Sequence, residues 1–197
     1  MNTQVTIVIP TVAKDRGYLI QAISSCLNQT IPVKVIVERS NHSCAYNLAN
    51  GVAKVDTPYY AILGDDDYYD SRFAETMIRA IGNADVCLCN AVQFSETQML
   101  HYNSKYTGHK DLLSHNTIHG GAVLYRTESG KGKYDPHLYC AEEYDLHLRL
   151  SKEGAIFSKV DYIGYYYRVH ANNKSKQLGE NRENRAKQIE IIKQRYT

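Results

Sequence analysis

The chain has 197 residues, a net charge of +2, and apolar and charged fractions of 43% and 22%. These values are typical of a soluble globular protein that buries a sizeable core. No apolar run approaches the length of a membrane span and no signal peptide is visible, so we expect no transmembrane segment. The five cysteines follow no disulfide-like pattern, which favours a reducing, cytoplasmic location.

Strand and helix patterns alternate over roughly the first ninety residues. Short β-branched or apolar runs predict four strands, at residues 5–9, 33–38, 59–63 and 85–90. Apolar residues at helical spacing predict helices between them, at residues 19–28, 45–52 and 73–81. This alternation is the signature of a doubly wound α/β layer, and we predict a mainly parallel central sheet flanked by helices.

One stretch combines a buried strand with an acidic loop. The apolar run 59–63 is followed by a glycine and three consecutive carboxylates, Asp65, Asp66 and Asp67. Adjacent carboxylates repel one another unless a cation lies between them, and the hard cations Mg²⁺ and Mn²⁺ suit such oxygen ligands. Ligands of open α/β sheets gather beyond the carboxyl ends of strands. We therefore predict a divalent metal site here, with a solvated polar turn as the alternative.

The second half of the chain is less regular. A glycine turn at residues 119–121 leads into a predicted strand, and a later strand is predicted at residues 163–170. Between them, Glu142 and Glu143 open a helical pattern that extends to Leu150. The last residues again show helical spacing and predict a closing helix.

These groups form a coherent chemical set. A metal that holds a diphosphate would stabilise a departing nucleotide, and a carboxylate of the Glu142–Glu143 pair could act as a general base. His170 could complete the metal shell, while Arg168 and Lys174 could contact phosphate oxygens. A helix cap is the alternative for the glutamates, and a structural role is the alternative for the histidine.

Five segments, in order, resemble the inverting family 2 glycosyltransferases, whose nucleotide-sugar-binding fold is called GT-A. The likeness runs from residue 5 to about residue 175. The segments are an opening strand, a helix similar to "aixSxLxQT", the acidic loop at the DxD position, a segment similar to "EDxDLwlRl", and a late element similar to "YRxHxxxxS". In this chain they are residues 5–11, 22–30, 63–67, 142–150 and 167–175.

The resemblance implies a division of the single domain, residues 1–197. Residues 1 to about 90 would form a Rossmann-like half that binds the nucleotide-sugar, and about 91–175 would form the acceptor and catalytic half. A C-terminal helix would follow over about 176–197.

The resemblance also implies roles for the donor-side residues. Pro10 and Thr11 would lie against the nucleotide, and Glu38 would approach the base and ribose. Asp65 and Asp67 would flank the ribose, the Mn²⁺ or Mg²⁺ ion and the diphosphate, with Asp67 the leading metal ligand. Asp66, Arg168 and Lys174 are further donor-binding candidates, and His170 would contact the metal or the diphosphate.

On the acceptor side, Glu143, with Glu142 as second choice, would deprotonate a hydroxyl that attacks the anomeric carbon with inversion. The donor would be a UDP-sugar before a GDP- or dTDP-sugar. The acceptor is unresolved between a glycan, a lipid-linked glycan and, less favoured, a modified nucleic acid. The chain has Glu-Glu where the family usually has Glu-Asp, so the identity of the base stays open by one residue.

Two other functions remain open. A nucleotidyltransferase also holds metal and nucleotide phosphates, but it usually has a glycine-rich basic loop after the first strand. Residues 12–17 are basic and poor in glycine. A non-catalytic sugar- or nucleic-acid-binding module of the same fold is the third hypothesis, and the acidic triplet argues against it.

Overall fold

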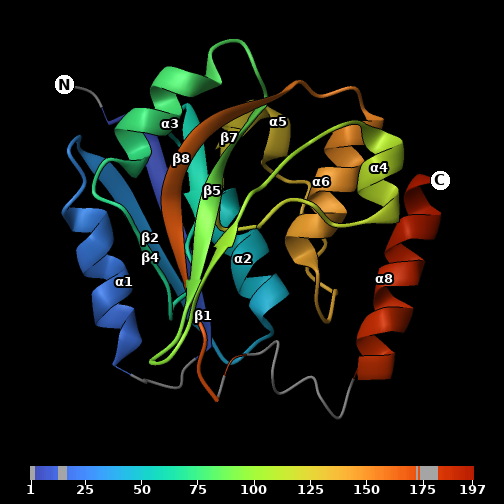
Figure 1. The fold of residues 1–197 in the computed structure, drawn as a ribbon, viewed down its shortest axis with the longest axis horizontal. Helices are drawn as coiled ribbons and strands as arrows, with labels where there is room; N and C mark the ends of the chain where they lie inside the picture. The colour runs from blue at the N-terminus through green and yellow to red at the C-terminus, as the bar shows by residue number, and fades with distance from the viewer. Residues whose placement is uncertain (1–2, 13–16, 172, 174–181) are drawn as a thin grey trace.

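The computed structural model describes residues 3–12, 17–171, 173 and 182–197. Within them, an eight-stranded sheet has helices packed on both faces (Figure 1). Its main path runs in the order β2-β1-β3-β7-β5-β8-β4, and β6 pairs with β5. The strands are β1 Val5–Val12, β2 Val33–Ser40, β3 Tyr59–Ile62, β4 Tyr68–Tyr69, β5 Val86–Phe94, β6 Met99–Tyr102, β7 Val123–Arg126 and β8 Phe157–Arg168.

The described helices are α1 Tyr18–Leu27, α2 Cys44–Ala53, α3 Phe73–Ile81, α4 His109–Ser114, α5 Thr127–Gly130, α6 Glu142–Lys152 and α8 Arg182–Tyr196. They follow local sequence signals. Ser43 caps α2 by accepting a hydrogen bond from the amide of Tyr46, and Gly82 ends α3 with a positive φ of 49°. α6 begins with three acidic residues in its first turn, where the helix dipole favours negative charge.

The sheet is mixed, whereas the sequence predicts a mainly parallel one. β1 pairs in parallel with β2 and β3, and β5 pairs in parallel with β8. β7 lies antiparallel between β3 and β5, and the short β4 and β6 are also antiparallel to their partners. Because β7 reverses direction between them, β3 and β5 point the same way. The carboxyl ends of β1, β2, β3, β5 and β8 therefore lie at one end of the sheet, which we call the carboxyl end.

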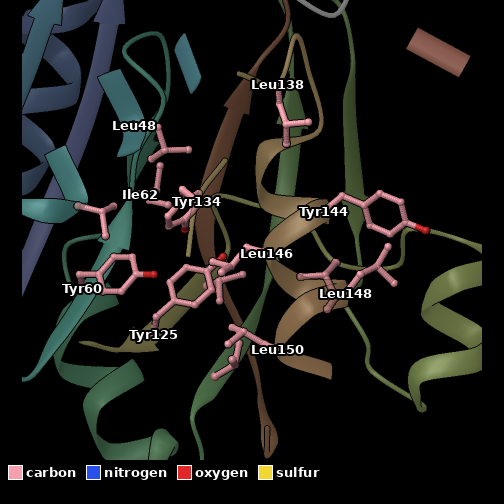
Figure 2. Close-up of a cluster of buried hydrophobic side chains, with 14 of the residues drawn as sticks. Leu48, Tyr60, Ile62, Tyr125, Tyr134, Leu138, Tyr144, Leu146, Leu148 and Leu150 are labelled. Atoms are coloured by element: carbon pink, nitrogen blue, oxygen red, sulfur yellow. The ribbon is translucent and has the colours of Figure 1, made fainter. Parts of the chain in front are cut away.

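Two hydrophobic clusters fill the space between the sheet and its helices. Alternate residues of β1 enter different clusters, Val8 the first and Ile7 and Ile9 the second, as expected for a strand buried on both faces. The first cluster includes residues of α2, α6 and α8, and the second includes residues of α1 and α3. Figure 2 shows the first cluster, in which Leu146 and Leu150 of α6 reach toward Tyr125 of the sheet.

Pro10 lies near the end of a central strand, a position that usually excludes proline. The pairing of β1 with β3 extends only from Val5 to Val8, so Pro10 lies beyond that ladder. The part of the chain described by the structure has no helix that is both long and apolar enough to traverse a lipid bilayer.

Candidate functional site

The acidic loop crosses the carboxyl end of the sheet. It leaves β3 at Leu63 and reaches β4 at Tyr68, and three strands, β7, β5 and β8, lie between β3 and β4. The three aspartates of the loop therefore pass over the ends of the central strands. Each of them has a different set of partners.

Asp65 is held by the end of β1. The hydroxyl of Thr11, which is only 4% exposed, donates to Asp65 Oδ2 at 2.5 Å. Thr11 is fixed in turn by the fully buried Asn47 of α2, whose Nδ2 donates to the Thr11 carbonyl at 2.9 Å. Asn47 Oδ1 also accepts a hydrogen bond from the hydroxyl of Ser40, so this one side chain joins the ends of β1 and β2.

Asp66 faces the segment that follows β8. Its Oδ2 lies 2.9 Å from His170 Nε2 and accepts a hydrogen bond from Asn173 Nδ2 at 3.1 Å. Asn173, 2% exposed, also accepts from the His170 amide at 2.5 Å through Oδ1 and donates to the Arg168 carbonyl at 2.9 Å. The side chains of Asp66 and His170 are 20% and 12% exposed, so both reach solvent.

Asp67 points into the protein. It is 2% exposed, and its two oxygens accept hydrogen bonds from the Tyr165 hydroxyl and, at 2.7 Å, from the Arg168 amide. Burial and the neighbouring charge of Asp66 raise the pKa of Asp67 well above its usual value, and these two donors oppose the increase. The sequence-based choice of Asp67 as the leading metal ligand stays a prediction, and this geometry favours a positioning role instead.

Arg168 is held by the protein rather than directed at open solvent. Its Nε donates to the Asp66 carbonyl at 2.9 Å and its Nη2 to Gln21 Oε1 at 2.6 Å. The guanidinium also lies over the rings of Tyr18 and Phe94, at 4.5 and 4.9 Å from their centroids. Arg168 thus fixes the acidic loop against α1 and β5.

Two other donor-side predictions have different outcomes. Glu38 pairs with Pro10 in the register of β1 and β2, and its carboxylate forms an ion pair with Lys54. Glu38 therefore lies two residues before the carboxyl end of β2, next to Pro10, and its contact with a base and ribose stays a prediction. Lys174, the last of the donor-side candidates, lies outside the described residues.

Two glycines before β7 connect the acidic loop with the candidate base. A Cβ atom at Gly120 would lie 2.8 Å from Cγ of Glu143, and one at Gly121 would overlap the ring of Tyr165. Tyr165 is the residue whose hydroxyl binds Asp67. Only glycines allow Glu143 and Tyr165 to approach this backbone so closely.

The two glutamates at the start of α6 have different surroundings. Glu143 packs on Gly120, and its negative charge adds to the effects of burial and of Tyr60 in raising the pKa of the buried Tyr125 and Tyr134. Glu142 is 7% exposed. The contact with Gly120 places Glu143 on the side of the acidic loop. Glu143 is thus the better-placed candidate base.

The third acid of the helix, Asp145, is fully buried and binds the end of the chain. Its Oδ1 accepts hydrogen bonds from the Tyr196 hydroxyl at 3.0 Å and from Arg195 at 3.2 Å. The acidic cluster thus contains at least one structural carboxylate that joins α6 to α8.

The described residues offer a divalent cation an arrangement of two ligands. Among the described ranges, no group of three His, Cys, Asp or Glu side chains is close enough to hold a metal. Asp66 and His170 do lie together, and Mg²⁺ commonly uses one or two carboxylates while substrate phosphates and water supply the other ligands. The donor set is therefore compatible with a metal that also binds a diphosphate.

Four residues of the site, Asn47, Gly120, Asn173 and Tyr165, have no role in the sequence-based prediction. Asn47 had a usable signal, because it is a polar residue between the apolar Ala45 and Leu48 of α2. Gly120 and Asn173 lie in segments that the sequence marked, the glycine turn at 119–121 and the late element at 167–175. Their partners Glu143 and Asp66, and the partner of Tyr165, Asp67, lie far away in the chain.

Solved structures show the same architecture. S. aureus TarS, fragment 1–349, in complex with UDP-GlcNAc matches with a TM-score of 0.71 and 13% identity, over 87% of this chain and 60% of that one. The same fragment in complex with UDP matches with a TM-score of 0.70 and 14% identity, over 96% of this chain and 65% of that one. A further structure of this fragment matches with a TM-score of 0.66 and 14% identity, over 84% of this chain and 60% of that one. This chain thus spans about three fifths of that fragment. At such low identity the likeness shows the fold alone, and it confirms the α/β fold of GT-A type.

Sequence comparison identifies the family. A comparison with curated protein sequences finds no significant match. The family model described as glycosyl transferase family 2 matches residues 18–132, more than half of the chain. That range contains the acidic loop and the two glycines but ends before Glu143 and His170, so the roles of those two residues depend on the geometry. The chain belongs to glycosyl transferase family 2.

Proposed function

We propose that the protein transfers a sugar from a nucleotide-sugar, in first place a UDP-sugar, to a hydroxyl acceptor, with inversion and with the help of Mn²⁺ or Mg²⁺. One observation carries the proposal. The carboxyl end of the sheet brings together Asp65 held by Thr11, Asp66 beside His170, and Glu143 against Gly120. Family membership supports it, and gives no support to a nucleotidyltransferase or a non-catalytic module.

The donor nucleotide would lie over the ends of β1 and β2. Pro10, Thr11 and Glu38 lie within two residues of the carboxyl ends of adjacent strands there, and the buried Asn47 joins those ends. Asp65, fixed by Thr11, would accept a hydrogen bond from the ribose hydroxyls. The TarS fragment, whose fold is similar, has been crystallised with UDP-GlcNAc and with UDP, which favours uridine diphosphate as the leaving group here.

Asp66 and His170 would hold the metal ion. Carboxylate oxygen and imidazole nitrogen are both ligands of Mn²⁺. Asn173 donates to the carboxylate of Asp66 and accepts from the backbone amide of His170, so it links the two residues. When bound, the ion would neutralise charge that develops on the departing diphosphate. Asp67, Tyr165 and Arg168 would keep the loop in place and contact neither metal nor sugar.

Glu143 would act as the general base. Its carboxylate would take the proton of the acceptor hydroxyl while the hydroxyl oxygen forms a bond to the anomeric carbon and the bond from that carbon to the diphosphate oxygen breaks. The base and the leaving group lie on opposite faces of the sugar in such a displacement, which inverts the anomeric configuration. Glu142 is the alternative base.

The acceptor would be a glycan or lipid-linked glycan, with a modified nucleic acid less favoured. We propose the division of the chain given above, with the acceptor between about 91 and 175. No disulfide joins the described cysteines, which supports a reducing location such as the cytoplasm.

Calorimetric binding of UDP, GDP and CDP, each with and without Mn²⁺, tests the donor assignment. We expect UDP to bind at least tenfold more tightly with Mn²⁺ than without it. Asp66→Asn should remove this gain in affinity, because it replaces the negatively charged carboxylate that would bind the metal with a neutral amide. Asp111→Asn on the exposed side of α4 is the matched control and should behave like the wild type. If no diphosphate shows metal-dependent binding, the proposed metal site is wrong.

A further inference from the structure

An open groove lies on the part of the molecule that the proposed chemistry does not use. It has a volume of about 600 Å³, within the range of about 300–1,000 Å³ that is common for ligand sites. Its walls come from β5, β6, β8 and the segment after β4. The residues important here are Asn90, His101, Tyr102, Asp161, Tyr162 and Tyr166.

The wall formed by β6 leads to the candidate base. The ring of Tyr102 contacts the ring of His119 edge-on, with centroids 5.5 Å apart. His119 directly precedes Gly120, against which Glu143 packs. The groove is therefore linked to Gly120, the residue that touches Glu143, through the contact between Tyr102 and His119.

The wall formed by β8 leads to the acidic loop. Tyr166 stacks on Tyr68 with centroids 4.7 Å apart and planes 9° from parallel. Tyr68 directly follows Asp67. The groove thus approaches both halves of the proposed site, one along each wall.

The lining combines aromatic rings with polar groups suited to hydroxyls. Rings such as that of Tyr166 offer a flat apolar surface to the C–H face of a pyranose, and the stack on Tyr68 holds that ring in place. Asp161 and His101 are exposed, and the carboxylate of Asp161 accepts a hydrogen bond from Asn90 at 2.8 Å. Carboxylate, amide and imidazole groups can each bond to sugar hydroxyls.

The charge of the groove limits the ligand. It contains two carboxylates, Asp70 and Asp161, and a single guanidinium, Arg72, which lies 3.8 Å from Asp70. Lys159, whose Nζ donates to Asn103 of the lining, brings these charges close to balance. A lining without a cluster of cations has no complementary charge for a polyanionic acceptor such as a polyol-phosphate chain or a nucleic acid.

We propose that this groove binds the acceptor, and that the acceptor is a neutral glycan of at least two sugar units. Its chain would lie along Asp161 and Tyr166, and its terminal hydroxyl would extend past Tyr102 and His119 toward Glu143. This inference rests on the proposed function, because it names the substrate of the same site.

A printed array of immobilised oligosaccharides, from disaccharides to hexasaccharides and including anionic ones, tests the groove without any nucleotide. We expect the wild type to be retained on a subset of neutral glycans, and Asp161→Asn and Tyr166→Ala each to weaken retention at least tenfold. The matched control Asp111→Asn should be retained like the wild type. Circular dichroism establishes that each variant is folded.

The same variants show whether the acceptor-groove proposal or the proposed function itself is wrong. Asp161→Asn should keep the metal-dependent affinity for UDP, since Asp161 has no contact with the acidic loop among the described interactions. Retention on anionic glycans alone, no retention at all, or retention that neither variant changes would each overturn the acceptor groove. Loss of metal-dependent UDP binding by the wild type would instead overturn the donor site.

Discussion

At the scale of single residues, the two adjacent glutamates of α6 give a sharp test of the mechanism. Replacement of Glu143 by Gln removes the group that would accept the proton, so we expect transfer to fall about 10²–10⁴-fold. Binding of UDP with Mn²⁺ should stay within about twofold, because the proposed role of Glu143, which packs on Gly120, is toward the acceptor hydroxyl and not toward the nucleotide. Initial rates and calorimetry on the same preparation measure both effects.

Glu142→Gln is the matched control for this experiment, since it makes the same chemical change one residue earlier. We expect it to retain most of the transfer rate. If Glu142→Gln is the inactive variant and Glu143→Gln is active, the base is Glu142, and the contact with Gly120 has only a packing role.

His147 provides a prediction about pH. It is fully buried, and burial lowers its pKa from 6.5 to about 3. Between these values the unfolded chain binds the proton and the folded chain does not, so stability is lost as the pH falls below about 6.5. From pH 6.5 to pH 5 the loss from this residue should be about 2 kcal/mol.

Urea unfolding of the wild type and His147→Gln at pH 7 and pH 5 measures this loss. The variant should be less sensitive to acid by about that amount. His119, whose pKa is also lowered by desolvation, to about 4, is present in both proteins and cancels in the comparison. Equal acid sensitivity would mean that His147 is already charged in the folded protein.

At the scale of elements, the join between α6 and α8 depends on a buried carboxylate. Asp145→Asn leaves Arg195 and Tyr196 without an anionic partner in the core, and we expect a loss of about 2–4 kcal/mol in unfolding free energy. Asp135 binds the same arginine at 2.9 Å but is 19% exposed, so Asp135→Asn should cost at most about 1 kcal/mol. Thermal or urea unfolding of both variants is the measurement, and equal losses would contradict the special role of Asp145.

At the scale of the whole molecule, Gly120 and Gly121 lie between Glu143, the proposed base, and Tyr165, the partner of Asp67. Gly120→Ala would displace Glu143, and a shift of about 1 Å can reduce the rate about 10²-fold while donor binding is unchanged. Gly121→Ala would displace Tyr165, the partner of Asp67, so we expect a loss of about 1–3 kcal/mol in stability and weaker UDP binding. Kinetics, calorimetry and unfolding separate the two outcomes. If both variants lose the same amount of transfer rate, UDP affinity and stability, the two glycines do not have the separate roles proposed here.

Much of the fold was predictable because its signals are local. The periods of strands and helices indicate β1, β2, β3, β5, β7 and most of the helices, and the acidic loop follows β3 as predicted. The short antiparallel strands β4 and β6 were missed, and β8 begins six residues earlier than predicted, at Phe157 rather than 163. β4 has only two residues, too few to show a period, and three of the four residues of β6 are exposed, so β6 has no buried apolar face to mark it.

The sequence by itself determined the order of the elements, the place of Asp65, Asp66 and Asp67 beyond a central strand, and the resemblance to the family. It could not determine which aspartate faces solvent. That depends on pairs such as Tyr165 and Asp67, which are 98 residues apart in the chain and meet only when β8 packs beside β5. Hydrophobic periodicity specifies which face of an element is buried, but the partner of each side chain is decided by how the elements pack. Only the tertiary structure could therefore turn Asp67 inward, bring Glu143 to Gly120, and form the groove between β6 and β8.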